Sequence, residues 1–138
     1  MSLEENKARF RRFIEEVENK KNVDVIDEFF AADYVDHNPP PFGEPGIEGF
    51  KQALGMFFSA FPDLHVEVED LIAEGDKVMG RMTTRGTHQG ELMGIAPTGK
   101  QITLAEIHIV RYSGGKVVEH WGMEDNLGMM QQLGIFPA

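Results

Sequence analysis

The chain lacks cysteine entirely over its 138 residues. This absence excludes disulfide bonds, thiolate metal ligands and cysteine nucleophiles. It also removes a common mark of small secreted scaffolds, so a reducing cytoplasm is the expected location. The first residues alternate in charge and lack the apolar core of a signal peptide. No apolar run approaches the ~20 residues that a membrane-spanning helix needs, so no membrane association is expected.

Basic residues are also scarce. The sequence has 13 Lys and Arg against 23 Asp and Glu, a formal net charge of −10, and its basic residues are scattered among acidic ones. Phosphate binding needs clustered basic side chains, so a nucleic-acid partner is not expected. None of the five histidines forms a pair with the spacing of a helical zinc site or a short loop chelate, and no metal site is expected.

The length and the absence of linkers and repeats predict a single domain over residues 1–138. Apolar residues recur at helical spacing up to about Lys20, after a Ser2/Glu5 capping box, then in a shorter segment with Ile26 and Phe30. The proline-rich loop YVDHNPPPFGEPG follows, and then a third helix that includes Phe57 and ends at Pro62. From Leu64 the period changes to two, which predicts long antiparallel strands up to a short final helix.

Helices followed by a meander of strands indicate an α+β fold. We expect a cone-shaped barrel, made of a strongly bent antiparallel sheet with helices packed over its concave face and a pocket inside. The convex face must be polar or be covered by a partner.

The last hairpin of this sheet carries the candidate site. Gly114 and Gly115 fit a two-residue turn, which makes Ser113 and Lys116 the last pair of the ladder. Counting back from this pair sets His108 opposite Trp121, Glu106 opposite Met123 and Leu104 opposite Asp125, with facing residues on the same side of the sheet. The register therefore predicts that His108, Trp121 and Asp125 line one surface.

An imidazole and a carboxylate across a shared space are the minimum equipment for general acid/base chemistry. Desolvation in an apolar pocket raises the pKa of a carboxyl group and makes it a stronger base when ionised. We expect Asp125 and His108 to act in this way, with Trp121, Met123 and phenylalanines as the apolar wall.

Two structural alternatives compete with this hypothesis. Asp125 stands where an N-cap of the final helix is favoured, and His108 could be an ordinary half-buried strand residue. A slip of the register by one residue would place His108 with His120 on the other face of the sheet. By the chosen register, His65 and His120 face away from Asp125, toward the surface or a dimer interface.

Two stretches, GTHQGELMGIAPTGK and GKVVEHWGMED followed by QLG, resemble the SnoaL-like polyketide cyclases, also labelled ester cyclases, of the nuclear transport factor two-like superfamily. The resemblance covers nearly the whole chain and implies an α+β cone that commonly dimerises through the outer sheet face. It also implies an intramolecular aldol condensation without metal or cofactor, with Asp125 in the aspartate's role and His108 in the histidine's. His37, in YVDHNP, and His88, in GTHQG, match other frequent family positions.

The sequence thus predicts a cofactor-free acid/base catalyst acting on an apolar, possibly polycyclic carbonyl compound held in an internal pocket. Its first rival is a non-catalytic module of the same fold that binds a small apolar ligand. Its second rival is an enzyme like the superfamily's steroid isomerases or epoxide hydrolases. Steroid isomerases need a further acid and a tyrosine in the pocket. Here Tyr34 is the only candidate for that tyrosine, because Tyr112 is expected to face outward. The full set of expected substrate-binding residues is His37, His88, Trp121, Met123, Glu106, Leu104, Phe57 and Tyr34.

Overall fold

The N-terminal helical region forms the wall of the internal cavity that lies opposite the sheet. The computed structural model describes residues 2–40 and 44–136. Helix α1 (Leu3–Phe13) begins at the predicted capping box, in which Ser2 and Glu5 bond to each other's backbone N–H groups. It continues into a π-helical segment, Ile14–Asn19, so the first helix ends close to the predicted Lys20. A short 3-10 helix, Val23–Glu28, follows.

Strand β1 (Phe30–Asp36) was not predicted, because Phe29 and Phe30 continue the helical spacing of the preceding residues. Helix α2 (Gly46–Ala60) agrees with the predicted third helix, which ends before Pro62. Part of the predicted proline-rich loop, residues 41–43, lies outside the described residues.

The sheet consists of β1 and four strands that follow in sequence. These are β2 (His65–Glu74), β3 (Lys77–Thr87), β4 (Gln101–Ser113) and β5 (Lys116–Glu124). Their order in the sheet is β1-β5-β4-β3-β2. The four later strands pair in antiparallel fashion as predicted, but β1 is added at the edge parallel to β5. The last helix, α3 (Asn126–Gln132), follows β5 directly.

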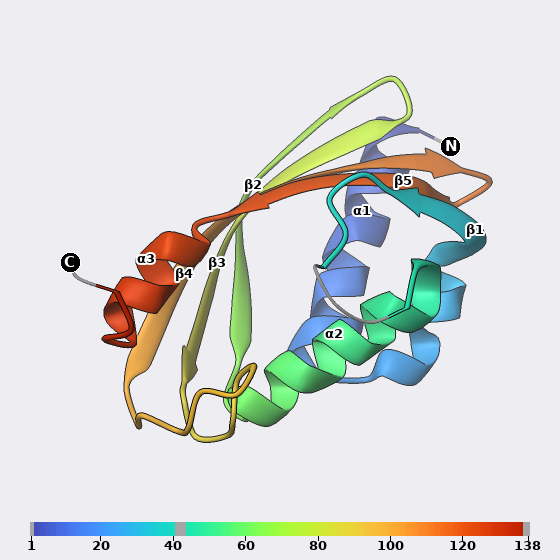
Figure 1. Cartoon of the computed structure of the whole chain (residues 1–138). Coiled ribbons are helices and arrows are strands. Elements are labelled where there is room, and N and C mark those ends of the chain that lie inside the picture. Colours follow the sequence, from blue (N-terminus) through green and yellow to red (C-terminus); the bar gives the residue numbers. More distant parts are fainter. Residues whose placement is uncertain (1, 41–43, 137–138) are drawn as a thin grey trace.

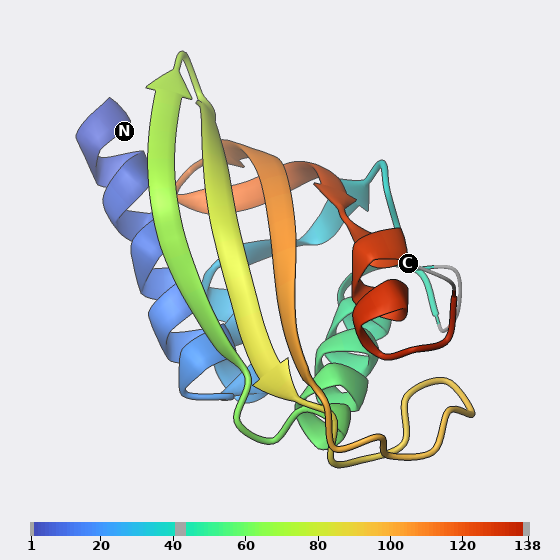
Figure 2. The same cartoon turned by 90° about the vertical axis from the view of Figure 1, so that its left-hand side faces the viewer.

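The layers form an open cone, which confirms the predicted α+β class although the sheet does not close into a barrel (Figure 1). The sheet curves around one side of the core, and α1 and α2 lie within its bend. In the view turned by 90°, β2, β3 and β4 run side by side with both helices behind them (Figure 2). Within the described residues, no helix has the length and apolar composition that a membrane span requires.

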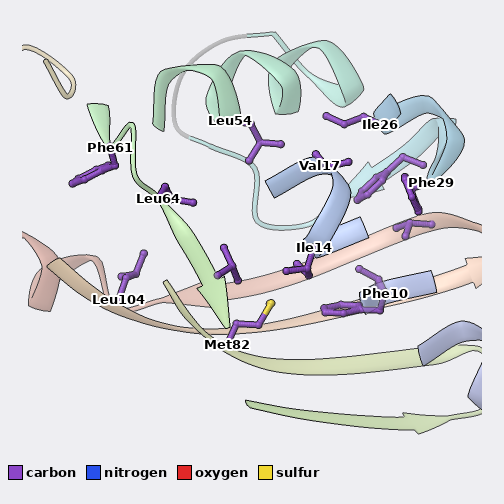
Figure 3. Close-up of a cluster of buried hydrophobic side chains, with 14 of the residues drawn as sticks. Phe10, Ile14, Val17, Ile26, Phe29, Leu54, Phe61, Leu64, Met82 and Leu104 are labelled. Carbon is purple, nitrogen blue, oxygen red and sulfur yellow. The ribbon is translucent and has the colours of Figure 1, made fainter. Parts of the chain in front are cut away.

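The core lies between these layers. Phe10 and Ile14 of the first helical region pack beside Met82 of β3, while Leu54 of α2 lies across from Leu64 and Leu104 (Figure 3). Gly80 of β3 makes this approach possible, because a Cβ atom there would lie 2.6 Å from the ring of Phe10. The helices therefore cover the concave face closely near β3 and leave a cavity nearer to β4 and β5.

Candidate functional site

The concave face of the sheet and the helices enclose a cavity of about 180 Å³. Its wall is mostly apolar, and among the described residues it contains no lysine or arginine. Five of the predicted site residues line it: Tyr34, Phe57, Leu104, Glu106 and His108. The apolar wall further includes Phe13, Phe30, Phe50, Leu54, Phe58, Met82, Ile102 and Val110. Their roles in substrate binding stay predictions, but their location fits a small apolar ligand.

A chain of hydrogen bonds crosses the polar end of this cavity. Asp36 and His120 are direct partners in the pairing of β1 with β5, and Asp36 Oδ1 lies 2.8 Å from His120 Nδ1. The other ring nitrogen of His120, Nε2, lies 2.8 Å from Nδ1 of His108. His108 Nε2 lies 3.1 Å from Glu106 Oε1, and Glu106 in turn accepts a hydrogen bond from Thr84. Two carboxylates thus terminate a row of two imidazoles.

The number of protons in this chain follows from its geometry. With Asp36 and Glu106 ionised, three hydrogen bonds need three N–H protons, which two neutral imidazoles cannot supply. One of the two rings is then an imidazolium, and we assign the charge to His108, which lies between His120 and Glu106 and has a raised pKa. Burial acts to lower the pKa of His108, but the hydrogen bond with Glu106 and the nearby carboxylates raise it above its usual value. For Asp36, burial acts to raise the pKa, yet the hydrogen bond from His120 brings it below its usual value.

Gly122 leaves room for the contact between the two imidazoles. A Cβ atom at this position would lie 2.4 Å from His108 Nδ1 and 2.9 Å from His120 Nε2. Because these two nitrogens form the hydrogen bond between the imidazoles, a side chain at position 122 is incompatible with that bond. The backbone N–H of Gly122 donates to Asn38 Oδ1 at 2.9 Å, which fixes the end of β1 beside the chain of hydrogen bonds.

Glu124 lies at the mouth of the cavity, with its side chain one-third exposed. It is the direct cross-strand partner of Glu106, and its Oε1 lies 3.9 Å from His108 Nε2. Burial and the adjacent Glu106 carboxyl raise the pKa of Glu124 to about 7. A carboxyl group with this pKa is suited to act as a general base near neutral pH.

Glu18 of the π-helical segment lines the same cavity. Burial, and next the charge of Glu106, raise the pKa of its carboxyl to about 8. Two carboxyls with raised pKa values, Glu18 and Glu124, therefore face one cavity together with the imidazolium of His108. The sequence offered one signal for Glu18, a glutamate four residues after Ile14 on the buried face of the first helix.

Both tyrosines of the chain also line the cavity. The prediction that Tyr112 faces outward is wrong, because its side chain is 5% exposed and lies beside Val110 in the cavity wall. Burial raises the pKa of each phenol well above its usual value, so both Tyr34 and Tyr112 stay protonated.

The predicted register of the last hairpin is wrong, although its turn is right. Ser113 does pair with Lys116, and Gly114 and Gly115 both have positive φ. A β-bulge then leaves Val118 without a partner on β4, so His108 faces Gly122 and Ile109 faces Trp121. One extra residue turns every later side chain of β5 to the opposite face of the sheet. His120 and Glu124 consequently line the cavity, where Trp121 and Asp125 had been expected.

Asp125 is the N-cap of α3, and its Oδ1 accepts a hydrogen bond from the backbone N–H of Gly128 at 2.9 Å. It is exposed and does not line the cavity.

Met123 is 75% exposed on the outer face. Trp121 lies on that face too, where its ring stacks on His37 at 4.7 Å between centroids. His37 Nε2 lies 2.8 Å from Glu119, so neither aromatic ring reaches the cavity.

His88 is fully buried, but it does not line the cavity either. Its Nδ1 lies 3.0 Å from Thr98 Oγ1 and accepts from the Thr98 backbone N–H at 3.2 Å. Its backbone N–H and carbonyl bond to Lys100 and Gly99. His88 therefore closes the base of the loop over residues 89–99, which connects β3 to β4. His65 is exposed, as predicted.

Among the described residues, one group of side chains could hold a metal ion. One donor atom from each of Glu106, His108 and Glu124 lies within 4.8 Å of the others. The fold brings these residues together from two strands, which local sequence spacing could not indicate. The expectation of a metal-free site stays a prediction.

Comparison with protein families gives a match over residues 8–133 to the model described as SnoaL-like polyketide cyclase. The chain is 32% identical over 130 residues to the aklanonic acid methyl ester cyclase DnrD of Streptomyces peucetius, covering 90% of this chain and 87% of the relative. It is 28% identical over 119 residues to the nogalonic acid methyl ester cyclase of Streptomyces nogalater, covering 84% and 88%.

Among solved structures, TsrD from Streptomyces laurentii superposes with a TM-score of 0.88 at 29% identity and covers 99% of both chains. The likeness therefore extends over the entire cone, including the strands that carry the chain of hydrogen bonds.

Proposed function

Since the chain belongs to the SnoaL-like polyketide cyclase family, we propose that it closes a ring by intramolecular aldol condensation of an apolar polyketide-like carbonyl compound, with Glu124 as acid/base. One observation carries this proposal. A carboxyl with a pKa near 7, beside an imidazolium, lies at the mouth of an apolar cavity that holds no lysine or arginine among its described residues.

The proposed reaction transfers one proton twice. The Glu124 carboxylate removes a proton from the carbon next to a carbonyl, and the electron pair of that C–H bond forms the enolate. The enolate carbon attacks a second carbonyl carbon of the same molecule, which forms the new C–C bond and leaves an alkoxide. Protonated Glu124 then returns its proton to the alkoxide oxygen, so the product is an isomer of the substrate. His108, 3.9 Å from Glu124, stabilises the ionised carboxylate.

The chain of hydrogen bonds serves as a support for His108. Glu106 and His120 occupy its two ring nitrogens, so they fix its protonation and ring orientation, as carboxylates do for catalytic histidines elsewhere. The aromatic wall holds the two reacting carbons close together, and such positioning can supply several kcal/mol of the barrier, up to ~7–11 in well-oriented systems.

The test is turnover of aklanonic acid methyl ester, the compound in the name of one relative. Chromatography with mass detection should reveal a product of unchanged mass. We expect Glu124→Gln to abolish its formation and Asp125→Asn to retain it. Loss of activity in Asp125→Asn with full activity in Glu124→Gln would return the catalytic role to Asp125, as first predicted from the sequence.

A steroid-isomerase-like reaction is the second candidate, favoured by the presence of both Tyr34 and Tyr112 in the cavity wall. A β,γ-unsaturated steroid ketone is the probe, since its conjugation is followed by ultraviolet absorbance. A module that only binds ligands predicts no turnover of either compound.

We also propose that the protein is a cytoplasmic homodimer formed through the convex face of the sheet. Ile107 and Met123 are direct cross-strand partners on that face and are 46% and 75% exposed. A second copy of the chain would cover this apolar pair. Analytical ultracentrifugation should show a dimer that Met123→Lys converts to a monomer; a monomeric parent protein contradicts this assignment.

A further inference from the structure

Glu18 is the one cavity carboxyl that the proposed reaction leaves unused and that no protein group bonds. Asp36 and Glu106 end the chain of hydrogen bonds, and Glu124 is the proposed base. Among the described residues, Glu18 has no hydrogen bond and no ion pair with lysine or arginine. A carboxyl group that lines a cavity and has no protein partner is available to a partner that arrives with the ligand.

The backbone at Glu18 is fixed from both sides. Glu18 belongs to a π-helical segment, a rare geometry that is found disproportionately at functional sites. The next residue, Asn19, clamps the segment to β2, because its side chain accepts from the Val66 N–H at 2.7 Å and donates to the Val66 carbonyl at 3.0 Å. Ile14 and Val17, which precede Glu18 in the segment, are buried. The segment therefore holds Glu18 in the helical wall of the cavity.

Burial and the charges around Glu18 together determine its protonation. Across the cavity it faces Glu106 and His108 of β4 and Glu124 of β5. The other titratable groups of the cavity are Asp36 of β1, His120 of β5 and the two tyrosines. Burial of Glu18 favours its neutral form, and so do these carboxylates, which outnumber the single imidazolium.

We propose that Glu18 is a second catalytic residue, which donates a hydrogen bond from its protonated carboxyl to the substrate carbonyl oxygen that becomes the enolate. This inference rests on the proposed function. When Glu124 removes the carbon-bound proton, negative charge develops on that oxygen, and the O–H of Glu18 stabilises it from the opposite wall. Removal of one such donor typically lowers kcat about 10²- to 10³-fold.

The first test is the pH profile of kcat/KM with aklanonic acid methyl ester. The base must be ionised, which requires a pH above about 7 for Glu124. The donor must be protonated, which requires a pH below about 8 for Glu18. We expect a narrow bell-shaped profile between these values.

Substitutions separate the donor from a structural role. Glu18→Gln keeps a donor that does not titrate, so the alkaline decline should disappear while activity at the optimum stays within about tenfold of the parent. Glu18→Leu should lower kcat about 10²-fold. Glu15→Gln, on the exposed face of the same segment, is the matched control and should leave the profile unchanged. An alkaline decline that persists in Glu18→Gln, or full activity of Glu18→Leu, overturns the inference.

A binding measurement supplies a readout without turnover. We expect 2-naphthol, an aromatic hydroxyl compound whose anion resembles a delocalised enolate, to bind the parent and Glu18→Gln and to bind Glu18→Leu at least about tenfold more weakly. Equal affinity for all three overturns the inference. If the parent and all variants lack turnover but 2-naphthol binding depends on Glu18 as expected, the proposed cyclisation fails while the donor assignment stands.

Discussion

On each face of β5, one residue of the strand forms a histidine–carboxylate contact with a residue at the end of β1, but the two contacts have opposite surroundings. On the inner face, His120 bonds to Asp36 at 2.8 Å and to a second histidine, with no lysine or arginine among the described residues lining the cavity. On the outer face, His37 bonds to Glu119, also at 2.8 Å, but Glu119 accepts from Arg111 as well. His37 is 39% exposed. The distances are the same, and the surroundings differ.

The difference shows that a histidine and a carboxylate in contact do not make a reactive site by themselves. Hydrogen bonds from His37 and Arg111 hold the pKa of Glu119 below its usual value, so it is a stable, weakly basic anion. Burial beside other carboxyls raises the pKa of Glu124 to about 7 instead. The inner face thus retains a carboxyl that exchanges protons near neutral pH, and the outer face does not.

The largest expected effect compares these two glutamates directly. Glu124→Gln should lower kcat at least about 10³-fold, because it removes the proposed base, whereas Glu119→Gln should leave kcat unchanged. Both variants keep the size of the side chain. Steady-state kinetics on aklanonic acid methyl ester check this, and equal losses in the two variants would remove the distinction between the faces.

The next effect concerns the two histidines. His120→Asn breaks the chain of hydrogen bonds between Asp36 and His108 and should lower kcat about 10- to 10²-fold, a loss typical of altered support for a catalytic group. His37→Asn should have no such effect. Nitrogen-15 NMR of the His108 ring is the decisive measurement. The fraction of His108 in the imidazolium form should decrease only in His120→Asn. Unchanged His108 resonances in both variants would contradict the support role.

A smaller effect is expected from Gly122→Ala. The added methyl group would meet the bonded nitrogens of His108 and His120 at 2.4 and 2.9 Å, so the rings must separate. We expect about a tenfold loss of kcat with the substrate KM little changed. Gly128→Ala, which would crowd Asp125 at 2.2 Å on the outside, is the control. It should affect the stability of α3 and leave kcat as in the parent.

The smallest effect belongs to the cap of α3. Asp125→Ala should lower the free energy of unfolding by about 1 kcal/mol, and Asp125→Asn by a few tenths at most, because asparagine caps almost as well as aspartate. Urea denaturation followed by circular dichroism measures both. A loss well above this range in Asp125→Asn would show that its carboxylate does more than cap the helix.

Much of the fold was predictable because its signals are local. The Ser2/Glu5 capping box, the end of α2 before Pro62 and the Gly114-Gly115 turn are all found as predicted. Strand β1 was missed because Phe29 and Phe30 continue a helical spacing, and its strand character comes from pairing with β5, a distant segment. Tertiary pairing overrode the local pattern here.

The site was predictable only in part. His108 and Glu106 line the cavity, since the face of β4 was assigned correctly, but the partners on β5 were assigned to the wrong face. A bulge such as that at Val118 has no strong sequence signal of its own, and it reverses every later assignment. The π-helical turn that carries Glu18 is likewise not apparent from apolar spacing alone.

The bulge in β5 also means that the same strand encodes two alternative sites. Deletion of the single residue Val118 would restore strict alternation and turn Trp121 and Asp125 inward in place of His120 and Glu124. The cavity would then exchange a glutamate for a shorter aspartate, a histidine for an indole and Gly122 for Met123, without any substitution. One codon gained or lost is thus enough to give this scaffold a different set of inward-facing groups.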